Sequence, residues 1–588
     1  MTHRSALLTI LLFLTACAMA PPPAPEVKQG EFAALPGYLE RLAEHKMAQD
    51  KVTGLSMAVV AHGQLIWSGG FGYADASTQQ PATDQTLFRA GSLSKLVNAV
   101  KVMQLVEAEQ LALDENIQTY LPDFSFHSRF DNTAPITLRD LLTHQSGLPS
   151  DLAYRMWTLD PPEPVDSVFP YLSSTYLASP PGEVYRYSNL GFDVIGTVIA
   201  KTANTPYANT MQSLLDAMGM QSAEFSSSPD EPPVAHGYQN HKPRTELLLR
   251  DIPAGGLSSN AIDLAQLLTL FTTQGKVDGE AIISPQSVAT ILSDYTSHAD
   301  LNTGTKAGLG VFEYQGRLHP SLKLYTHNGA THSHRALILF SAQHRYGVVL
   351  LSNSANASHT LRALGEASIE LLHQATYGEP APTITSRWPR LAERDNSSLE
   401  QMTGFYATPA GLAQFAVLNE TLKAHFAGKT FATQQQVKQG PHYLDYKLFG
   451  FIPIDLGHLG RIGFSTRKVN GKTLLIGTDT LGIERIAGVK IEPVPIPNAW
   501  RERVGDYTLT REFPVADVKS GGLRIKNGFL LAQAKLATGE SLEYVLQPVN
   551  DHLAIIAGLG RSLGETVFAK RDQHGQWLEF SGLRFERE

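Results

Sequence analysis

The fold is decided by the stretch Phe88-Arg89-Ala90-Gly91-Ser92-Leu93-Ser94-Lys95-Leu96, in which Ser92 and Lys95 form an S-x-x-K pair. Apolar residues follow at helical spacing as far as Glu109, namely Leu96, Val97, Val100, Met103, Leu105 and Val106. Residues three positions apart lie on the same side of a helix. The pattern therefore predicts that the Ser92 hydroxyl and the Lys95 amine face each other at the start of a helix.

A serine and a lysine at this spacing indicate nucleophilic catalysis. A serine hydroxyl attacks poorly until a base removes its proton, and a partly buried lysine can lose its own proton and become that base. The helix N-terminus adds free N–H groups where an oxyanion would form. The pair alone is weak evidence, because Ser465 and Lys468 repeat the spacing ahead of a turn. A helix N-cap followed by a surface lysine is the structural alternative for Ser92.

Length and composition describe a globular protein of several domains. The chain has 588 residues, which favours about four domains, and 43% of its residues are hydrophobic, enough for several cores. The net charge is −8 and no long basic run is present, so the composition argues against a nucleic-acid partner.

Residues 1–29 are predicted to be a lipoprotein signal peptide and a proline-rich tether. The apolar core over 6–14 is too short to span a bilayer. Leu14-Thr15-Ala16-Cys17 then resembles the cleavage box of bacterial lipoproteins, and Cys17, the only cysteine, is the predicted lipidation site. The following Ala18, in place of aspartate, favours a periplasm-facing anchor in the outer membrane of a bacterial envelope. An ordinary secretory peptide cut nearby is the alternative.

Beyond the tether, composition separates a mixed part from an all-β part. Helical periodicity disappears after a linker rich in proline and charge, and strand-like runs then alternate with glycine and asparagine turns. Gly404-Phe405-Tyr406 recurs as Gly505-Asp506-Tyr507, which predicts two barrel-like modules. The predicted parts are a hydrolase domain over 30–380, the linker 381–398, and β-barrel-like modules over 399–492 and 493–588.

Two further motifs follow Ser92 in order. Tyr187-Ser188-Asn189 comes 95 residues later, after a Pro-Gly loop, and His327-Asn328-Gly329 precedes the last hairpin of the first part. Together with Leu141–Leu148 and Pro253–Leu257, they resemble the serine beta-lactamase and penicillin-binding-protein superfamily over about residues 35–378. Tyr-x-Asn as the second element points to the branch of class C beta-lactamases, D-peptidases and D-aminopeptidases, because class A enzymes carry Ser-Asp-Asn there.

This resemblance implies an α/β (α+β) domain with an antiparallel sheet, flanking helices and a central buried helix after Ser92. It also implies an acyl-enzyme mechanism in which Ser92 attacks a carbonyl. Lys95 and Tyr187 would share the proton transfer, and which of them is the base is disputed in the family. A structural role in the core is the alternative for each residue.

The remaining site residues are expected to bind substrate. By resemblance, Asn189 would orient Lys95 or the substrate amide, and the backbone N–H groups of Ser92 and Ala330 would form the oxyanion hole. His327, with Gly329 in the same motif, stands where many relatives have lysine. As a neutral or charged donor it would face the substrate carboxylate or the tyrosine.

Several competing patterns have structural explanations. Tyr207-Ala208-Asn209 and Tyr238-Gln239-Asn240 also fit Tyr-x-Asn, but neither follows a Pro-Gly loop. Gly560–Gly564 fits the nucleophile elbow of another hydrolase fold, but a strand rather than a helix is predicted after it. His332 and His334 have no carboxylate cluster beside them and are expected to be solvated or structural. No metal and no cofactor is therefore expected.

The expected function is that of an envelope-anchored serine hydrolase, which cleaves a small amide or ester, with a D-amino-acid peptide as one candidate. The order of one such domain and two β modules resembles the three-domain D-aminopeptidases, in which the modules shape access to the site. A shortened chain ending near Pro380 is accordingly expected to fold and keep basal activity. The alternatives are a penicillin-binding or sensor-like protein with slow or no turnover, and a carboxylesterase. The expected partners are a small-molecule or peptide substrate and, through Cys17, a membrane.

Overall fold

The computed structural model describes residues 20–588 with internal gaps. Those gaps are residues 229, 231–233, 298, 300, 303, 389–398, 427, 438–439, 449–451, 454–455, 511–517, 537–540 and 574. The predicted lipidation site Cys17, the signal peptide up to residue 19 and part of the predicted linker lie outside the described residues. Among the helices that are described, none combines the length and the apolar character needed to cross a membrane.

A seven-stranded antiparallel sheet forms the frame of the first part, in the order β13-β14-β15-β16-β1-β2-β3. Side chains alternate between its two faces, so that Ala58 and Val60 belong to one core while Met57 and Val59 belong to the other. The strands are β1 Gly54–Ala61, β2 Gln64–Asp75, β3 Gln80–Pro81, β13 Phe312–Glu313, β14 Tyr325–Ala330, β15 Arg335–Ser341 and β16 Tyr346–Ser352.

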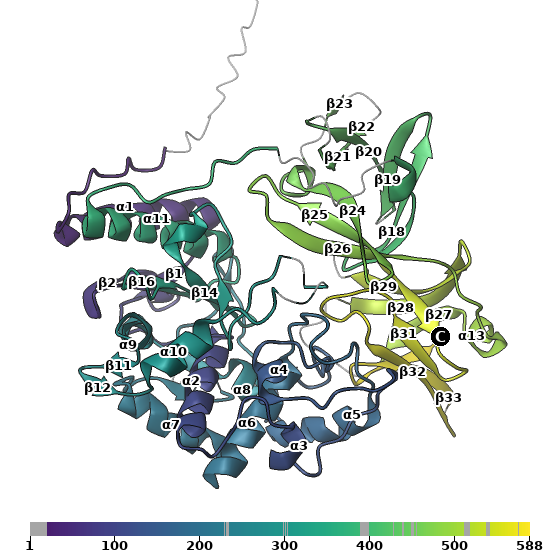
Figure 1. Cartoon of the computed structure of the whole chain (residues 1–588), viewed down its shortest axis with the longest axis horizontal. Helices are drawn as coiled ribbons and strands as arrows, with labels where there is room; N and C mark the ends of the chain where they lie inside the picture. Colours follow the sequence, from purple (N-terminus) through teal and green to yellow (C-terminus); the bar gives the residue numbers. More distant parts are fainter. Residues whose placement is uncertain are drawn as a thin grey trace, which may run out of the picture.

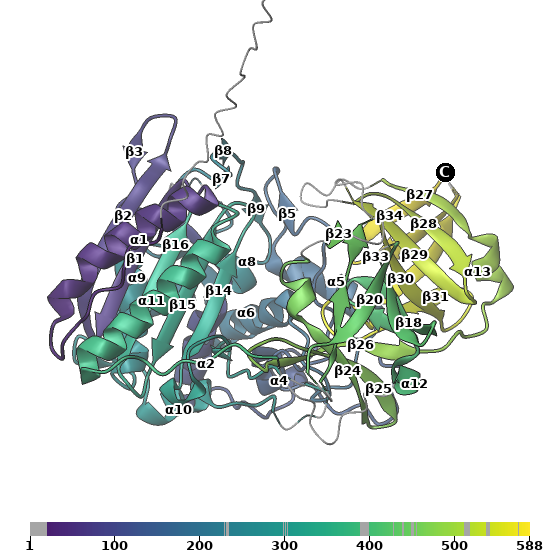
Figure 2. The same cartoon turned by 90° about the horizontal axis from the view of Figure 1, so that it is seen from above.

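Helices cover both faces of this sheet. The first helix and the last helix of the first part, α1 (Leu35–Asp50) and α11 (Ser358–Tyr377), lie side by side on one face (Figures 1 and 2). The other face packs on α9 (Ala261–Thr272) and on the helix that follows Ser92, α2 (Ser94–Glu107). Because α2 is packed on nearly every side, ten of its residues are buried.

The rest of the first part is a helical lobe with short strands. Its longest helix, α6, begins at Asn189, where the Ser188 side chain caps it by accepting from the Gly191 N–H. The helices are α3 Ile117–Tyr120, α4 Leu138–Leu142, α5 Phe169–Ser174, α6 Asn189–Ala203, α7 Tyr207–Ala217, α8 Ile252–Gly255 and α10 Pro285–Leu292. The short strands are β4 Phe88–Gly91, β5 Trp157–Thr158, β6 Glu224–Phe225, β7 Tyr238–Gln239, β8 Lys242–Pro243, β9 Leu248–Leu249, β10 Leu257–Ser259, β11 Lys276–Val277 and β12 Glu280–Ala281.

The C-terminal part forms two closed antiparallel barrels of eight strands each. The first barrel contains β17 Gly404–Thr408, β18 Gly411–Leu418, β19 Thr421–Phe426, β20 Lys429–Gln435, β21 His442–Asp445, β24 Gly463–Val469, β25 Lys472–Thr478 and β26 Glu484–Ile491, with β22 Lys447–Leu448 and β23 Ile452–Pro453 beside it. The second contains β27 Gly505–Leu509, β28 Val518–Lys526, β29 Phe529–Leu536, β30 Ser541–Pro548, β31 Leu553–Ile556, β32 Thr566–Asp572, β33 Gly575–Phe580 and β34 Leu583–Arg587.

The sequence repeat has a structural cause. A short helix precedes each barrel, α12 (Leu399–Met402) and α13 (Asn498–Glu502), and the repeated glycine starts the first strand. Tyr406 donates its hydroxyl hydrogen to the Met402 carbonyl at 3.0 Å, and Tyr507 does the same to the Arg503 carbonyl at 2.7 Å. Both tyrosines therefore tie their barrel to the preceding turn. The predicted mixed domain and the two barrel-like modules are confirmed.

The second barrel is joined to the first part through buried polar contacts, on the side where α5 lies next to β32 (Figure 1). Arg186 is fully buried and donates to the carbonyl oxygens of Gly560 and Leu563. The Glu565 carboxylate, also buried, accepts from the Ser150 N–H at 2.8 Å. Buried polar groups of the first part and of the second barrel therefore hydrogen-bond to each other. Separating the two parts would break these bonds and expose the groups to water.

Candidate active site

Ser92 lies in the turn between β4 and α2, and Lys95 lies in the first turn of that helix. The Lys95 side chain is fully buried, and its Nζ is 3.3 Å from Ser92 Oγ. Nζ also lies 2.9 Å from Asn189 Oδ1 and 2.6 Å from the Ala254 carbonyl oxygen. The structure therefore brings together the pair that the sequence predicts, with the amine fixed from two further elements.

A close approach of two strands places Ala330 beside Ser92. Gly91 adopts a φ of 56°, and a Cβ atom there would lie 2.8 Å from the Ala330 backbone nitrogen. A Cβ atom on Gly329 would lie 1.9 Å from the Ala90 carbonyl oxygen. Glycine at both positions lets β14 approach β4 at this distance. Ser92 and Ala330 consequently line the same cleft.

Tyr187 and Asn189 enter the site from the start of α6. The Lys95 Nζ lies 4.9 Å from the centroid of the Tyr187 ring. The His144 ring packs against the Tyr187 ring, with 4.3 Å between the two ring centroids. Burial holds the pKa of His144 well below its usual value, with Lys95 as the next cause, and its Nδ1 accepts from the Ser188 N–H. His144 is therefore a neutral ring that packs against Tyr187.

A hydrogen-bonded chain connects Lys95 to the second barrel. Asn189 accepts from Lys95 and donates through Nδ2 to Asp151 Oδ1 at 2.7 Å. The other carboxylate oxygen of Asp151 pairs with Arg561 at 2.7 Å, and that pairing raises the pKa of Arg561. The Arg561 guanidinium also lies 5.4 Å from the centroid of the Tyr187 ring. A residue of the last barrel thus belongs to the site.

Neither Asp151 nor Arg561 was predicted from the sequence. Arg561 lies in Gly560–Gly564, the segment whose pattern matched a nucleophile elbow. The structure shows an irregular loop between β31 and β32, with positive φ at Gly558, Gly560, Ser562 and Gly564. These glycines allow a tight loop that projects an arginine. A lone arginine between two glycines in an otherwise regular β module was the one signal that the sequence offered.

His327 is a neutral side chain in this site. It is buried on β14, and burial followed by the nearby Lys95 lowers its pKa to about 3. Its Nδ1 lies 2.8 Å from the Asn328 carbonyl oxygen, which can only accept, so Nδ1 carries the proton and Nε2 carries a lone pair. Nε2 has no hydrogen-bond partner among the described residues. In this tautomer the ring presents an acceptor to the site, so the expected donor role would require a proton on Nε2 as well.

The site opens into a cleft of about 580 Å³ that carries an excess of positive charge. Its lining includes Ser92, Tyr187, Asn189, His327 and Ala330. The charged lining residues come from three parts of the chain and are Lys306, Glu313, Arg362, Arg485 and Arg561. Only one of these five is an acid, and that acid pairs with a lysine at 2.9 Å. The cleft should therefore attract anionic groups.

The competing motifs lie elsewhere in the fold. Ser465 and Lys468 are on β24 in the first barrel, and Tyr207 begins α7, where its hydroxyl donates to Asn98. His334 is fully buried with its Nε2 2.9 Å from the Ala235 carbonyl oxygen. Within the described part of the chain, no three histidine, cysteine, aspartate or glutamate residues are grouped so that they could hold a metal ion.

A buried carboxyl group under the site predicts a pH effect on stability. Asp193 lies one turn after Asn189, is fully buried, and neither of its oxygens has a hydrogen-bond partner among the described residues. Burial, followed by repulsion from Asp251, raises the pKa of Asp193 well above its usual value. Asp251 instead pairs with Arg250 at 2.7 Å. Burial and this repulsion therefore favour the protonated form of Asp193 in the folded protein.

Folding then takes up a proton at Asp193, so stability should fall as pH rises from about 4 through the raised pKa. Asp193→Asn carries no titrating group at this position. Relative to the natural protein, its free energy of unfolding should therefore rise by up to about 1.4 kcal/mol per pH unit between pH 4 and the raised pKa. Urea unfolding at pH 5, 6, 7 and 8 measures this. The exposed Asp166→Asn is the control. Parallel stability curves for Asp193→Asn and the natural protein would show that Asp193 is ionised when folded.

Comparison with known proteins gives consistent matches. The family model described as Beta-lactamase matches residues 39–372. Protein flp of Staphylococcus aureus (strain N315) is 20% identical over 354 residues, which cover 59% of this chain and 68% of that protein. A crystal structure of SurE with D-Leu superposes with a TM-score of 0.55 and 20% identity, over 78% of this chain and 100% of that chain. The octameric penicillin-binding protein homologue from Pyrococcus abyssi gives a TM-score of 0.50 and 22% identity, over 77% of this chain and 99% of that chain.

Proposed function

Because the chain belongs to the beta-lactamase family, we propose that it is a serine hydrolase that uses Ser92 as its nucleophile. The observation that carries the proposal is the environment of Lys95. Its Nζ has three oxygen neighbours, and the oxygens of Asn189 and Ala254 can only accept hydrogen bonds. These contacts hold Nζ against Ser92 Oγ, at the place that a base needs in order to take the hydroxyl proton.

The reaction would proceed through an acyl-enzyme. The Ser92 Oγ attacks the substrate carbonyl while its proton passes to the pair of Lys95 and Tyr187. The oxyanion is stabilised by the backbone N–H groups of Ser92 and Ala330. The proton then goes to the leaving amine or alcohol, and a water molecule hydrolyses the ester on Ser92. Asn189 holds the Lys95 amine in place, and the His327 Nε2 accepts from a donor on the substrate or from Tyr187.

The substrate is proposed to be a small amide or ester with an anionic group, and a peptide with a D-residue is one candidate. The cationic lining disfavours a substrate with a free ammonium group and favours a carboxylate. The structural similarity to SurE, solved with D-Leu, supports a D-residue. A penicillin-binding protein with slow turnover, or a carboxylesterase, would use the same nucleophile.

Intact-mass spectrometry can separate these possibilities. The protein would be incubated with p-nitrophenyl acetate, with benzylpenicillin and with an N-acetylated D-alanyl-D-alanine peptide. Turnover without a lasting adduct supports the hydrolase, and the substrate turned over names its class. A stable adduct on the Ser92 tryptic peptide with no turnover would identify a penicillin-binding protein. No adduct and no turnover with any of the three would contradict the proposed function.

We also propose that the protein is anchored to a bacterial membrane through a lipid on Cys17. The support is the sequence box over 14–17. A Cys17→Ser variant is expected to move from the membrane fraction to the soluble fraction, because the attachment site is gone. Immunoblotting of fractions after a salt wash measures this, with Ser5→Ala as a control in the same segment. A Cys17→Ser protein that stays on membranes would contradict the anchor.

A further inference from the structure

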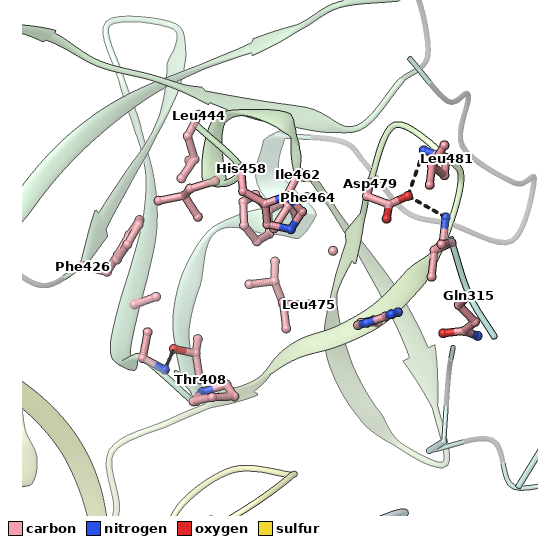
Figure 3. A pocket seen from close by; sticks show the side chains of 18 of the residues that line it. Gln315, Thr408, Phe426, Leu444, His458, Ile462, Phe464, Leu475, Asp479 and Leu481 are labelled. Carbon is pink, nitrogen blue, oxygen red and sulfur yellow. Dashed lines mark hydrogen bonds between the residues drawn. The ribbon is translucent and has the colours of Figure 1, made fainter. Parts of the chain in front are cut away.

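The first barrel encloses a cavity with an apolar wall. Its volume is about 370 Å³, and Figure 3 shows several of its side chains around a common space, namely Phe426, Leu444, Ile462, Phe464 and Leu475. The interior of an eight-stranded barrel is either filled by side chains or holds one small ligand. Packed protein cores contain few voids larger than a water molecule. This cavity instead has the size of a small-molecule site.

The cavity of the first barrel adjoins the catalytic cleft. Gln315, Arg362 and Arg485 line both spaces. Arg485 is on β26, where Arg485 and Ala487 line the barrel cavity at alternate positions, and Ile483, which lines it too, precedes the strand. A substrate that occupies the cleft at Ser92 therefore meets the mouth of the barrel at the two arginines.

The two arginines at this mouth form a binding place for an anion. Neither side chain makes an ion pair with a carboxylate of the described residues within 4.0 Å. Asp479 attracts Arg485 but accepts hydrogen bonds from the backbone of Leu481 and Ile483. The two cations are neighbours because they line the same two spaces. Burial lowers the pKa of Arg485, and the like charge of Arg362 lowers it further. A bound anion would relieve that repulsion.

We propose that the interior of the first barrel is a subsite of the catalytic cleft for the alkyl chain of an anionic amphiphile. The proposal rests on the proposed function and extends it to a substrate class. The scissile carbonyl would lie at Ser92, the carboxylate or phosphate at Arg362 and Arg485, and the alkyl chain inside the barrel. Burying such a chain contributes about 0.8 kcal/mol for each methylene group removed from water.

The second barrel provides a matched comparison. It encloses a similar apolar cavity of about 390 Å³, but none of the residues that line it also lines the catalytic cleft. Ala487 lines the first cavity and Ala532 lines the second, and both are half-buried alanines on barrel strands. Substitution of either alanine by phenylalanine fills one cavity and leaves the other unchanged.

The experiment measures dodecanoate binding by isothermal titration calorimetry in the Ser92→Ala background, where no turnover can interfere. We expect Ala487→Phe to raise the dissociation constant at least about tenfold, and Ala532→Phe to leave it within twofold. Arg362→Gln with Arg485→Gln should also weaken binding about tenfold or more. In the catalytically intact protein, Ala487→Phe should keep p-nitrophenyl acetate hydrolysis, which shows that it is folded, and lose preference for p-nitrophenyl decanoate.

Equal dodecanoate affinity in the parent and in Ala487→Phe, or a larger loss in Ala532→Phe, would overturn the subsite. Failure of the proposed function would give a different result. If the intact protein bound dodecanoate in the first barrel but hydrolysed neither ester, the hydrolase would be wrong and the ligand site in the barrel would stand. If it hydrolysed both esters and bound no dodecanoate, the hydrolase would stand and the ligand site in the barrel would be wrong.

Discussion

Substitution of Ser92 by alanine is expected to lower kcat/KM for p-nitrophenyl acetate by about three orders of magnitude or more. In the described chain, Ser92 Oγ is the one hydroxyl oxygen that contacts the buried Lys95 amine, at 3.3 Å. Without it no acyl-enzyme can form, and only binding and the oxyanion N–H groups remain to accelerate the reaction. The measurement is ester hydrolysis at several substrate concentrations, with circular dichroism to verify the fold.

The chain offers a matched control for this variant. Ser465 is the other serine of an S-x-x-K pair, but it is buried on β24 of the first barrel, whereas Ser92 lines the cleft. Ser465→Ala should therefore leave ester hydrolysis within about twofold. Near-normal turnover by a folded Ser92→Ala protein would remove Ser92 from the mechanism. Equal losses in both variants would indicate a general effect on folding.

Much of this architecture follows from local sequence patterns. The helical period of the apolar residues from Leu96 to Val106 indicates α2, which runs over Ser94–Glu107. The repeated Gly-x-Tyr marks the start of each barrel because each tyrosine bonds to the turn before it. These features depend on residues within a few positions of each other, where periodicity and turn chemistry are informative.

The missed part of the site depends on contacts between residues far apart in the chain. Asp151 and Arg561 are separated by 410 positions, and no periodicity in either segment links them. The state of His327 was also out of reach, because its neutral form follows from burial and the nearby Lys95. The sequence could predict a candidate nucleophile, Ser92, but not the distant residues that position the groups around it.

Removal of the second barrel is expected to cost activity even toward the smallest ester. From the sequence, the modules were expected only to shape access, with basal hydrolysis surviving without them. The structure instead connects Arg561 through Asp151 to Asn189, which holds the Lys95 amine. A chain that ends at residue 492 should therefore lose about two orders of magnitude in kcat/KM for p-nitrophenyl acetate, because small displacements of catalytic groups are that costly.

Full-length variants separate the catalytic contribution of the barrel from its structural one. Arg561→Gln removes the partner of Asp151 and keeps the barrel in place, so we expect a smaller loss of about tenfold in kcat/KM. Arg571→Gln, an exposed arginine on β32 of the same barrel, should change nothing. Glu565→Gln tests the interface itself, because its buried carboxylate accepts from the Ser150 N–H.

The relative size of these losses decides what the second barrel does. If the shortened protein hydrolyses p-nitrophenyl acetate as fast as the intact protein does, the second barrel only controls access to the site. The hydrogen bonds through Asp151 would then not contribute to catalysis. If Arg561→Gln alone reproduces the full loss, the barrel acts through that one guanidinium. The expected order, in which the deletion costs more than Arg561→Gln, follows from the buried Arg186. Its acceptors on Gly560 and Leu563 hold the segment that leads to Tyr187. Loss of the barrel would then displace Tyr187, and it would also remove the Arg561 contact that holds Asp151 against Asn189.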